Sequence, residues 1–193
     1  MSFEGRRRRL WLVLLGLLGV AVCAFFLWDG LRVRSTDSQA GAFSYQHAAL
    51  PLPASRPGEA VVFTLQTANG KRGFTLRQFQ ALPAVRYAAL QPQVAQQHTY
   101  QGVALRDLAE MAGVAGQDVR VMGSDDFGAT IQAADYMKYP VMIAYSAEGQ
   151  SLTPAQKGPL MVVFPNVQAP QRFPSKIYGS QWVWFAESLG RAP

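Results

Sequence analysis

The amino-acid sequence predicts an α+β domain that holds more strand than helix and is preceded by one transmembrane helix. Between residues 59 and 190, short segments rich in β-branched and aromatic side chains alternate with turn signals, a pattern typical of strands. The segment Leu105 to Ala112 instead has apolar residues at helical spacing, and Gly113 follows as a helix stop. Residues 10–28 form an apolar run of 19 residues without a charge.

Strands are expected wherever the β-type segments occur, at residues 59–67, 73–75, 85–90, 99–103, 119–122, 127–132, 141–146, 160–164 and 182–188. Asn69 and Gly70 form a hairpin-turn pair between the first two strands. Short helices are expected at residues 76–81, with Thr75 as the cap, and at residues 133–137. Many strands with few short helices place the domain in the α+β class.

The apolar run at residues 10–28 is predicted to anchor the protein in the inner membrane as a single-pass helix. A helix of this length spans about 28 Å, close to the hydrocarbon thickness of a bilayer. Four arginines at residues 6–9 precede the run, whereas only Arg32 and Arg34 follow it. Because excess basic charge marks the cytoplasmic side, residues 1–9 are predicted to be cytoplasmic and the domain periplasmic.

A cleaved signal peptide is the rival interpretation of this run, with a cut near Ala40 or Ala42. Signal peptides usually have a shorter apolar stretch followed by small residues at the cut, whereas this run ends in bulky side chains up to Trp28. A Tat-type signal is a further alternative that the arginines suggest.

Residues 29–58 are predicted to be a tether, because the stretch is rich in Ser, Gln, Ala and Gly and contains three prolines. The domain at residues 59–190 then has the size of a single domain. Residues 35–193 carry twelve basic and ten acidic side chains, so their net charge is only +2. A nearly neutral domain without a basic stripe is not expected to bind nucleic acid.

The order of the sequence segments carries a resemblance to a known family. "FTLRQFQALP" is followed by "TYQGVALRDLAEMAGV", then by "VRVMGSDDFGATI", "PVMIAYSAEGQSLTPAQKGPLMVVFP" and "YGSQWVWFAESL". Together these segments resemble the molybdopterin-binding domain of the sulfite oxidase type, found in periplasmic molybdenum oxidoreductases. The resemblance covers about residues 60–190 and implies the β-rich mixed fold of that family.

The resemblance also implies a cysteine thiolate as the molybdenum ligand, in the segment between the "ALP" helix and the "GVAL" helix. In this chain that segment is Val85 to Gln101, and it contains no cysteine. The one cysteine of the sequence, Cys23, lies in the apolar run. Because neither Gln nor His replaces a thiolate without changing the chemistry, we expect no metal site and no cofactor, with molybdopterin as the alternative.

Seven residues are candidates for a ligand-binding site, and no residue is assigned a catalytic role. The family tends to place basic residues near its closing strand, where this chain has Trp182 and Trp184. We expect both indoles on one face of that strand, either as core residues or as a stacking platform for a ligand or partner. Arg172 and Lys176, just upstream, are candidates for binding an anion or are solvated charges.

The remaining three candidates lie earlier in the chain. His98 is in the segment that lacks the cysteine, and it either lines the cofactor cleft that the resemblance implies or is a surface residue. Asp125 and Asp126 either form a turn or point a carboxylate into the cleft.

These observations favour a membrane-anchored periplasmic binding or accessory module that is non-catalytic. It would bind a small ligand, or a membrane signalling or redox partner protein, in a sensory or redox-associated bacterial system. One alternative is a molybdopterin-dependent oxidoreductase with a non-cysteine metal ligand. A second alternative is a structural subunit of a membrane complex.

Overall fold

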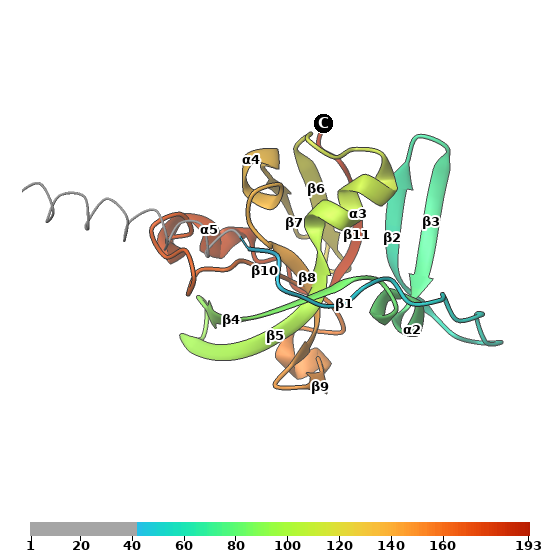
Figure 1. Ribbon diagram of the computed structural model, residues 1–193, viewed down its shortest axis with the longest axis horizontal. Coiled ribbons are helices and arrows are strands. Elements are labelled where there is room, and N and C mark those ends of the chain that lie inside the picture. Colours follow the sequence, from blue (N-terminus) through green and yellow to red (C-terminus); the bar gives the residue numbers. More distant parts are fainter. Residues whose placement is uncertain (1–41) are drawn as a thin grey trace, which may run out of the picture. The chain divides into compact units, whose positions relative to one another are not determined.

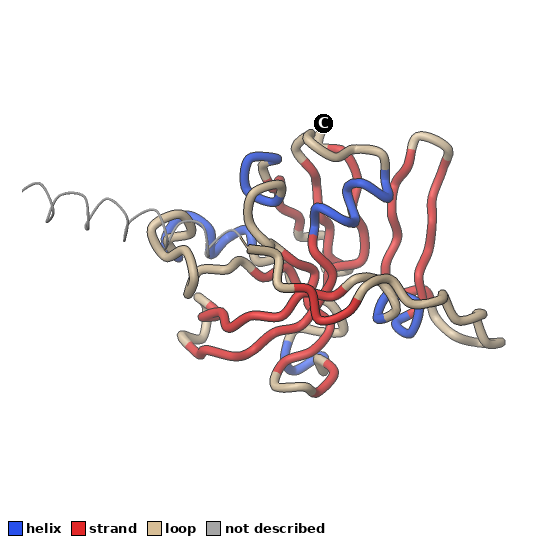
Figure 2. The backbone as a smooth tube through the Cα atoms, viewed as in Figure 1, coloured by secondary structure: helices blue, strands red, loops and turns tan. Residues whose placement is uncertain are grey.

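The computed structural model describes residues 42–193, which form two β-sheets with short helices around them (Figure 1). Strands make up most of the ordered elements, as the tube drawing shows (Figure 2). The first sheet has the strand order β1-β4-β5-β8-β10, and β9 pairs with β8 outside this order. Its strands are β1 (Tyr45–His47), β4 (Ala84–Gln91), β5 (Gln96–Ala104), β8 (Met142–Ala147), β9 (Gln150–Ser151) and β10 (Met161–Val163).

The second sheet has the strand order β3-β2-β11-β6-β7. The hairpin of β2 and β3 is antiparallel, and the pair of β2 and β11 is parallel, so the last strand joins the first hairpin to the hairpin of β6 and β7. Its strands are β2 (Val61–Thr67), β3 (Gly70–Thr75), β6 (Val119–Gly123), β7 (Gly128–Ile131) and β11 (Ala186–Arg191).

The helices of the described chain are short. They are α2 (Leu76–Gln80), α3 (Leu105–Ala112), α4 (Ala133–Tyr136) and α5 (Ser175–Tyr178), with 3₁₀ turns at Pro154–Gln156 and Gly179–Gln181. Helix α3 buries Leu105 and Leu108 against β2, β11 and β5, and it ends at Gly113 in the left-handed conformation, as predicted. The expected α+β class with many strands is therefore confirmed for the domain.

The hydrophobic core is continuous across the two sheets. It is formed by inward-facing side chains of the strands together with those of α2 and α3. In β2, for example, Phe63 and Leu65 are buried whereas Thr64 and Gln66 point outward, which is the period of two that a half-buried strand requires. The largest fully buried side chains include Tyr100, Tyr136, Phe63, Phe74, Phe79, Phe164 and Phe173.

Thr75 caps α2 as the sequence predicts. The Gln78 backbone N–H donates to the Thr75 hydroxyl, and the Thr75 backbone N–H donates to the Gln78 side-chain carbonyl, a complete capping box. We expect Thr75→Val to lower the free energy of unfolding by about 1 kcal/mol, because the first turn loses its acceptor while the volume is preserved. Thr75→Ser keeps the acceptor and is the control. Urea denaturation measures both variants, and equal losses would contradict a capping role.

The domain begins earlier than the sequence predicts. Within the predicted tether at residues 29–58, Tyr45–His47 forms β1, which pairs with β4 and is the edge strand of the first sheet. The Tyr45 hydroxyl donates to the Asp107 carboxylate over 2.8 Å, and the Arg106 guanidinium lies 3.5 Å from the Phe43 ring centroid. These contacts come from residues far apart in sequence, so local composition did not reveal them.

The predicted strand at residues 182–188 is corrected in its first half. Strand β11 begins only at Ala186, and Trp182 to Phe185 form a loop that crosses between the sheets. At one end of this loop, the Val183 carbonyl accepts a hydrogen bond from the backbone N–H of Val162 in β10 of the first sheet. At the other end, the Phe185 carbonyl accepts from the N–H of Ser124, which follows β6 of the second sheet. Phe185 has a φ of 51°, outside the strand region, and Trp182 and Trp184 both precede β11, so the two indoles do not alternate along a strand.

The predicted anchor at residues 10–28 lies outside the described residues. Within residues 42–193, no helix is both long and apolar enough to cross a membrane.

Candidate functional site

Three connections meet at a pocket of about 280 Å³. They are the turn between β4 and β5, the turn between β6 and β7, and the segment from α5 to β11. Figure 1 shows the hairpin of β4 and β5 reaching toward α5, and the Gln93 side chain closes this contact by donating to the Gly179 carbonyl over 2.8 Å. The lining residues are Gln93, Asp125, Phe127, Gly179, Ser180, Trp182 and Trp184.

Trp182 forms the inner wall of this pocket and is also part of the core. Its side chain is only 2% exposed, and its ring meets Tyr100 edge to face with 6.3 Å between centroids. Edge-to-face packing of this kind holds an aromatic ring in one orientation. Trp182 is therefore a core residue, one of its two predicted alternatives, and it also lines the pocket.

Trp184 is the second indole of the lining, and it is half-buried. Its Nε1 is buried and has no hydrogen-bond partner among the described residues. The Lys157 ammonium lies 4.5 Å from the ring centroid, a cation–π contact. The Phe185 backbone N–H donates to the Lys157 carbonyl over 3.1 Å, so the lysine is held beside the indole by the chain itself.

Asp125 lines the pocket from the turn between β6 and β7. Its Oδ1 accepts the Phe127 backbone N–H over 3.2 Å, and Asp126 adopts a φ of 62° in the same turn. The turn interpretation and the pocket interpretation thus both apply to Asp125, because one carboxylate oxygen caps the turn while the residue lines the pocket. Asp126 is exposed and does not contribute to the lining.

Arg172 has a partner within the chain. Its guanidinium donates to Asp135 Oδ1, and the Tyr178 hydroxyl donates to Asp135 Oδ2 over 3.2 Å. Asp135 is only 1% exposed, and this burial raises its pKa, whereas Arg172 and Tyr178 act to lower it. The ion pair ties α4 to the segment around α5.

His98 and Lys176 lie away from the pocket. The His98 Nδ1 is 3.8 Å from Glu148 Oε1, and its ring meets Tyr100 edge to face at 5.9 Å. Lys176 is exposed on α5. Of the seven candidate residues, Asp125, Trp182 and Trp184 come together, whereas His98, Asp126, Arg172 and Lys176 do not line the pocket.

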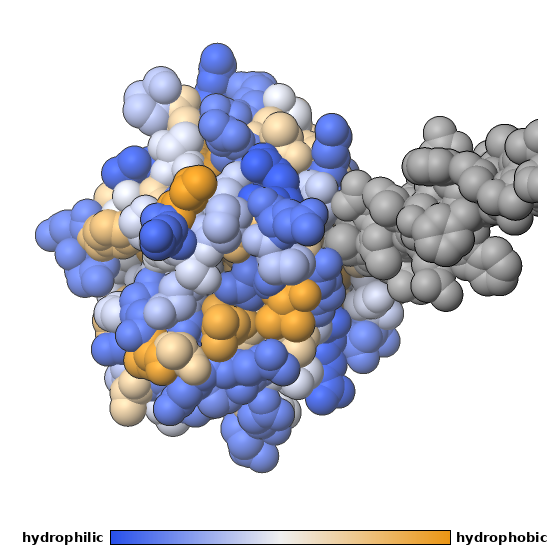
Figure 3. Space-filling view, turned by 90° about the vertical axis from the view of Figure 1, so that its left-hand side faces the viewer, coloured by the Kyte–Doolittle hydropathy of each residue, from blue (hydrophilic) through white to orange (hydrophobic). Residues whose placement is uncertain are grey.

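Four lining residues escaped the sequence analysis: Gln93, Phe127, Gly179 and Ser180. The sequence did contain a signal for Phe127, because an aromatic residue in a polar turn is unexpected unless it contacts something. In the structure Phe127 is 46% exposed. Val94 and Ile177 in the adjoining connections are also exposed apolar residues, at 49% and 64%. The face that carries α5 and the tip of the β4–β5 hairpin has apolar residues gathered among hydrophilic ones (Figure 3).

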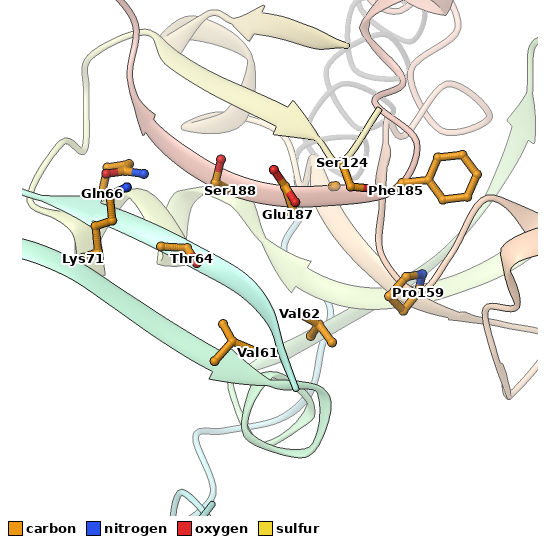
Figure 4. A pocket seen from close by; sticks show the side chains of 11 residues that line it. Val61, Val62, Thr64, Gln66, Lys71, Ser124, Pro159, Phe185, Glu187 and Ser188 are labelled. Carbon is orange, nitrogen blue, oxygen red and sulfur yellow. The ribbon is translucent and has the colours of Figure 1, made fainter. Parts of the chain in front are cut away.

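A second cavity, of about 410 Å³, lies over the outward face of β2 and β11. Figure 4 shows Gln66 and Lys71 at one end, Val62 and Pro159 toward the other, and Glu187 between them. Its walls are mainly outward-facing side chains of paired strands, and none of the seven candidates is among them. The first pocket is therefore the better candidate site.

Comparison with known proteins supports the predicted fold. Residues 28–172 match the model of the family described as the oxidoreductase molybdopterin binding domain. Among solved structures, the chain is similar to the sulfane dehydrogenase SoxCD from Paracoccus pantotrophus, with a TM-score of 0.53 and 20% sequence identity. The similarity covers 74% of this chain and 40% of that chain, so this protein spans less than half of its structural neighbour. No curated protein matches the chain.

Proposed function

The chain belongs to the oxidoreductase molybdopterin-binding domain family, and we propose that it is a non-catalytic member that binds a small ligand in the pocket of Trp182 and Trp184. The protein would act as a periplasmic binding or accessory module, held at the inner membrane by residues 10–28. The single observation that carries the proposal is the lining of the pocket, which is largely aromatic and contains neither a thiolate nor a basic side chain.

The donors in the described domain do not fit the family's cofactor. Residues 42–193 contain no cysteine, and within them no group of three or more His, Cys, Asp or Glu side chains is arranged to hold a metal ion. The pocket lining includes no Lys or Arg to pair with a phosphate, and its one charged member is the carboxylate of Asp125. Arg172, one of the two basic candidates from the sequence, pairs with Asp135.

The pocket retains what a ligand site needs. It is concave, mostly apolar and formed where three connections meet. One of its lining residues, Trp184, has a buried Nε1 that lacks a partner among the described residues. Its inner wall is held in place by the packing of Trp182 on Tyr100. A pocket with rigid aromatic walls and few polar groups favours recognition of a small ligand over chemistry.

The test is a metal and pterin analysis of the full-length chain, purified in a nonionic detergent from cells that make the molybdenum cofactor. We expect substoichiometric molybdenum and no pterin fluorescence after oxidation. A family member that contains the ligand cysteine, expressed and purified in parallel, controls for the cofactor supply. One molybdenum per chain would refute the proposal and support the alternative of an oxidoreductase with a non-cysteine ligand, which family membership favours.

A further inference from the structure

The pocket lining combines three aromatic side chains with one carboxylate and contains no basic residue. We propose that the ligand of this pocket is a small organic cation, such as a quaternary or substituted ammonium compound. This inference rests on the proposed function, because it names the ligand class of the same pocket. It follows from the aromatic rings and the carboxylate of the lining, and from the cation–π contact that Trp184 makes with Lys157.

Aromatic walls favour cations over anions. Trp182, Trp184 and Phe127 present ring systems whose faces carry negative partial charge, and indole is the strongest of these for binding an ammonium group. Such contacts strengthen when water is removed, and the Trp184 indole of the lining is half-buried. A cluster of rings around a concave site is therefore suited to an alkylated ammonium, which loses little hydration energy on entry.

Trp184 already binds an ammonium group from the chain. Lys157 Nζ lies 4.5 Å from its ring centroid, although Lys157 is not among the residues that line the pocket. The indole thus already makes one cation–π contact within the chain. The lysine also adds a positive charge near the pocket, so it is expected to oppose a cationic ligand and to limit its affinity.

Asp125 supplies the opposite charge. Its Oδ1 is occupied by the Phe127 backbone N–H, whereas no described residue donates a hydrogen bond to its Oδ2. Asp125 therefore brings to the lining a carboxylate with one oxygen that no described residue occupies. An anionic ligand would meet this carboxylate without a cation in the lining to offset it.

The volume limits the size of the ligand. At about 280 Å³ the pocket is just below the roughly 300–1,000 Å³ that drug-sized ligands occupy. A compound of the size of choline matches this space. The proposal therefore concerns a small head group rather than an extended ligand.

Calorimetric titration of the full-length chain in a nonionic detergent tests the charge requirement. Choline is the cationic probe, and 3,3-dimethylbutan-1-ol is its uncharged probe of the same shape. We expect choline to bind at least about fivefold more tightly than the alcohol, because only choline makes cation–π contacts. Equal or tighter binding of the alcohol overturns the inference, as does the absence of choline binding.

Three substitutions locate the binding site and test each charge. We expect Asp125→Asn to weaken choline binding at least about threefold, and Lys157→Met to strengthen it, because the two charges act on the ligand with opposite signs. Asp126→Asn is the matched control, since Asp126 neighbours Asp125 but lies outside the lining. Trp184→Leu should abolish the preference for choline over the alcohol. Equal effects of the two aspartate variants would contradict the assignment of Asp125.

These outcomes separate the ligand class from the proposed function. Binding of the alcohol but not of choline, lost in Trp184→Leu, rejects the cation and leaves a ligand-binding module. Stoichiometric molybdenum in the purified chain rejects the function itself, whatever the titrations show.

Discussion

Replacing Arg172 by methionine is expected to lower the free energy of unfolding by about 3 kcal/mol near pH 7, since removal of one partner of a buried ion pair typically costs about 3–5 kcal/mol. The remaining partner, Asp135, is 1% exposed, and among the described residues Arg172 is the only basic side chain that pairs with it. Arg172 itself is 37% exposed, which places the expected loss at the low end of that range. Methionine keeps much of the aliphatic stem, so the loss reports mainly on charge.

The pH dependence of this loss identifies its origin. Burial already raises the pKa of Asp135, so its folded form binds a proton more tightly than its unfolded form. The contribution of Asp135 to the free energy of unfolding is therefore fully present at low pH. It is lost as the pH rises from the pKa of Asp135 in the unfolded chain through its higher pKa in the folded protein. Without Arg172 the pKa rises further, so the deficit of the variant should be largest near about pH 7 and shrink toward about pH 4.

Chemical denaturation at several pH values measures this effect. Arg86→Met is the matched control, because Arg86 is exposed on β4, and we expect a change within about 0.5 kcal/mol. The double variant Asp135→Asn, Arg172→Met should recover part of the lost stability, since it leaves no buried charge. A deficit of Arg172→Met that does not change with pH would instead indicate lost packing.

Replacing Gly102 by alanine is expected to destabilise the domain by at least about 3 kcal/mol, within the large effects that overpacking of a core produces. Gly102 is buried in β5, and a Cβ atom there would overlap the Ile143 carbonyl and lie 2.5 Å from the Ala144 Cα on β8. Both obstacles are backbone atoms of a paired strand, so no side-chain rotation relieves them. The pairing of β5 with β8 already has a register shift at this glycine.

Gly179→Ala is the matched control for this substitution. A Cβ atom at Gly179 would meet the Pro92 Cβ at 3.4 Å, which is ordinary van der Waals contact, and the residue has a helical φ. We expect its thermal midpoint to stay close to that of the unmodified protein. Loss of the same magnitude in both variants would show that glycine flexibility, rather than space between β5 and β8, explains the effect.

Elements whose signal lies within a few neighbouring residues were predictable. Asn69 and Gly70 predicted the hairpin of β2 and β3, Thr75 predicted the cap of α2, and Gly113 predicted the end of α3. In each case the interaction joins residues close in sequence, so propensity and pattern carry the information. The family resemblance, drawn from the order of such elements, was confirmed by the match over residues 28–172.

Elements that depend on distant partners were not predictable. Strand β1 exists because Tyr45–His47 finds the free edge of β4, and its polar composition by itself suggested a tether. Trp182 to Phe185 has the composition of a strand, but it forms a loop whose backbone hydrogen bonds go to residues beside both sheets. Likewise, no residue near Asp135 in the sequence indicated that its carboxylate would form an ion pair with Arg172.

The sequence alone established the secondary structure of most of the domain and the absence of a cysteine between residues 42 and 193, because both are properties of local residues. The tertiary structure decided which candidates meet. It brought Asp125 beside Trp182 and Trp184, added Phe127 to them, and assigned Arg172 to a buried carboxylate instead. A pocket made where three connections converge depends on the packing of strands far apart in the chain, which no local pattern encodes.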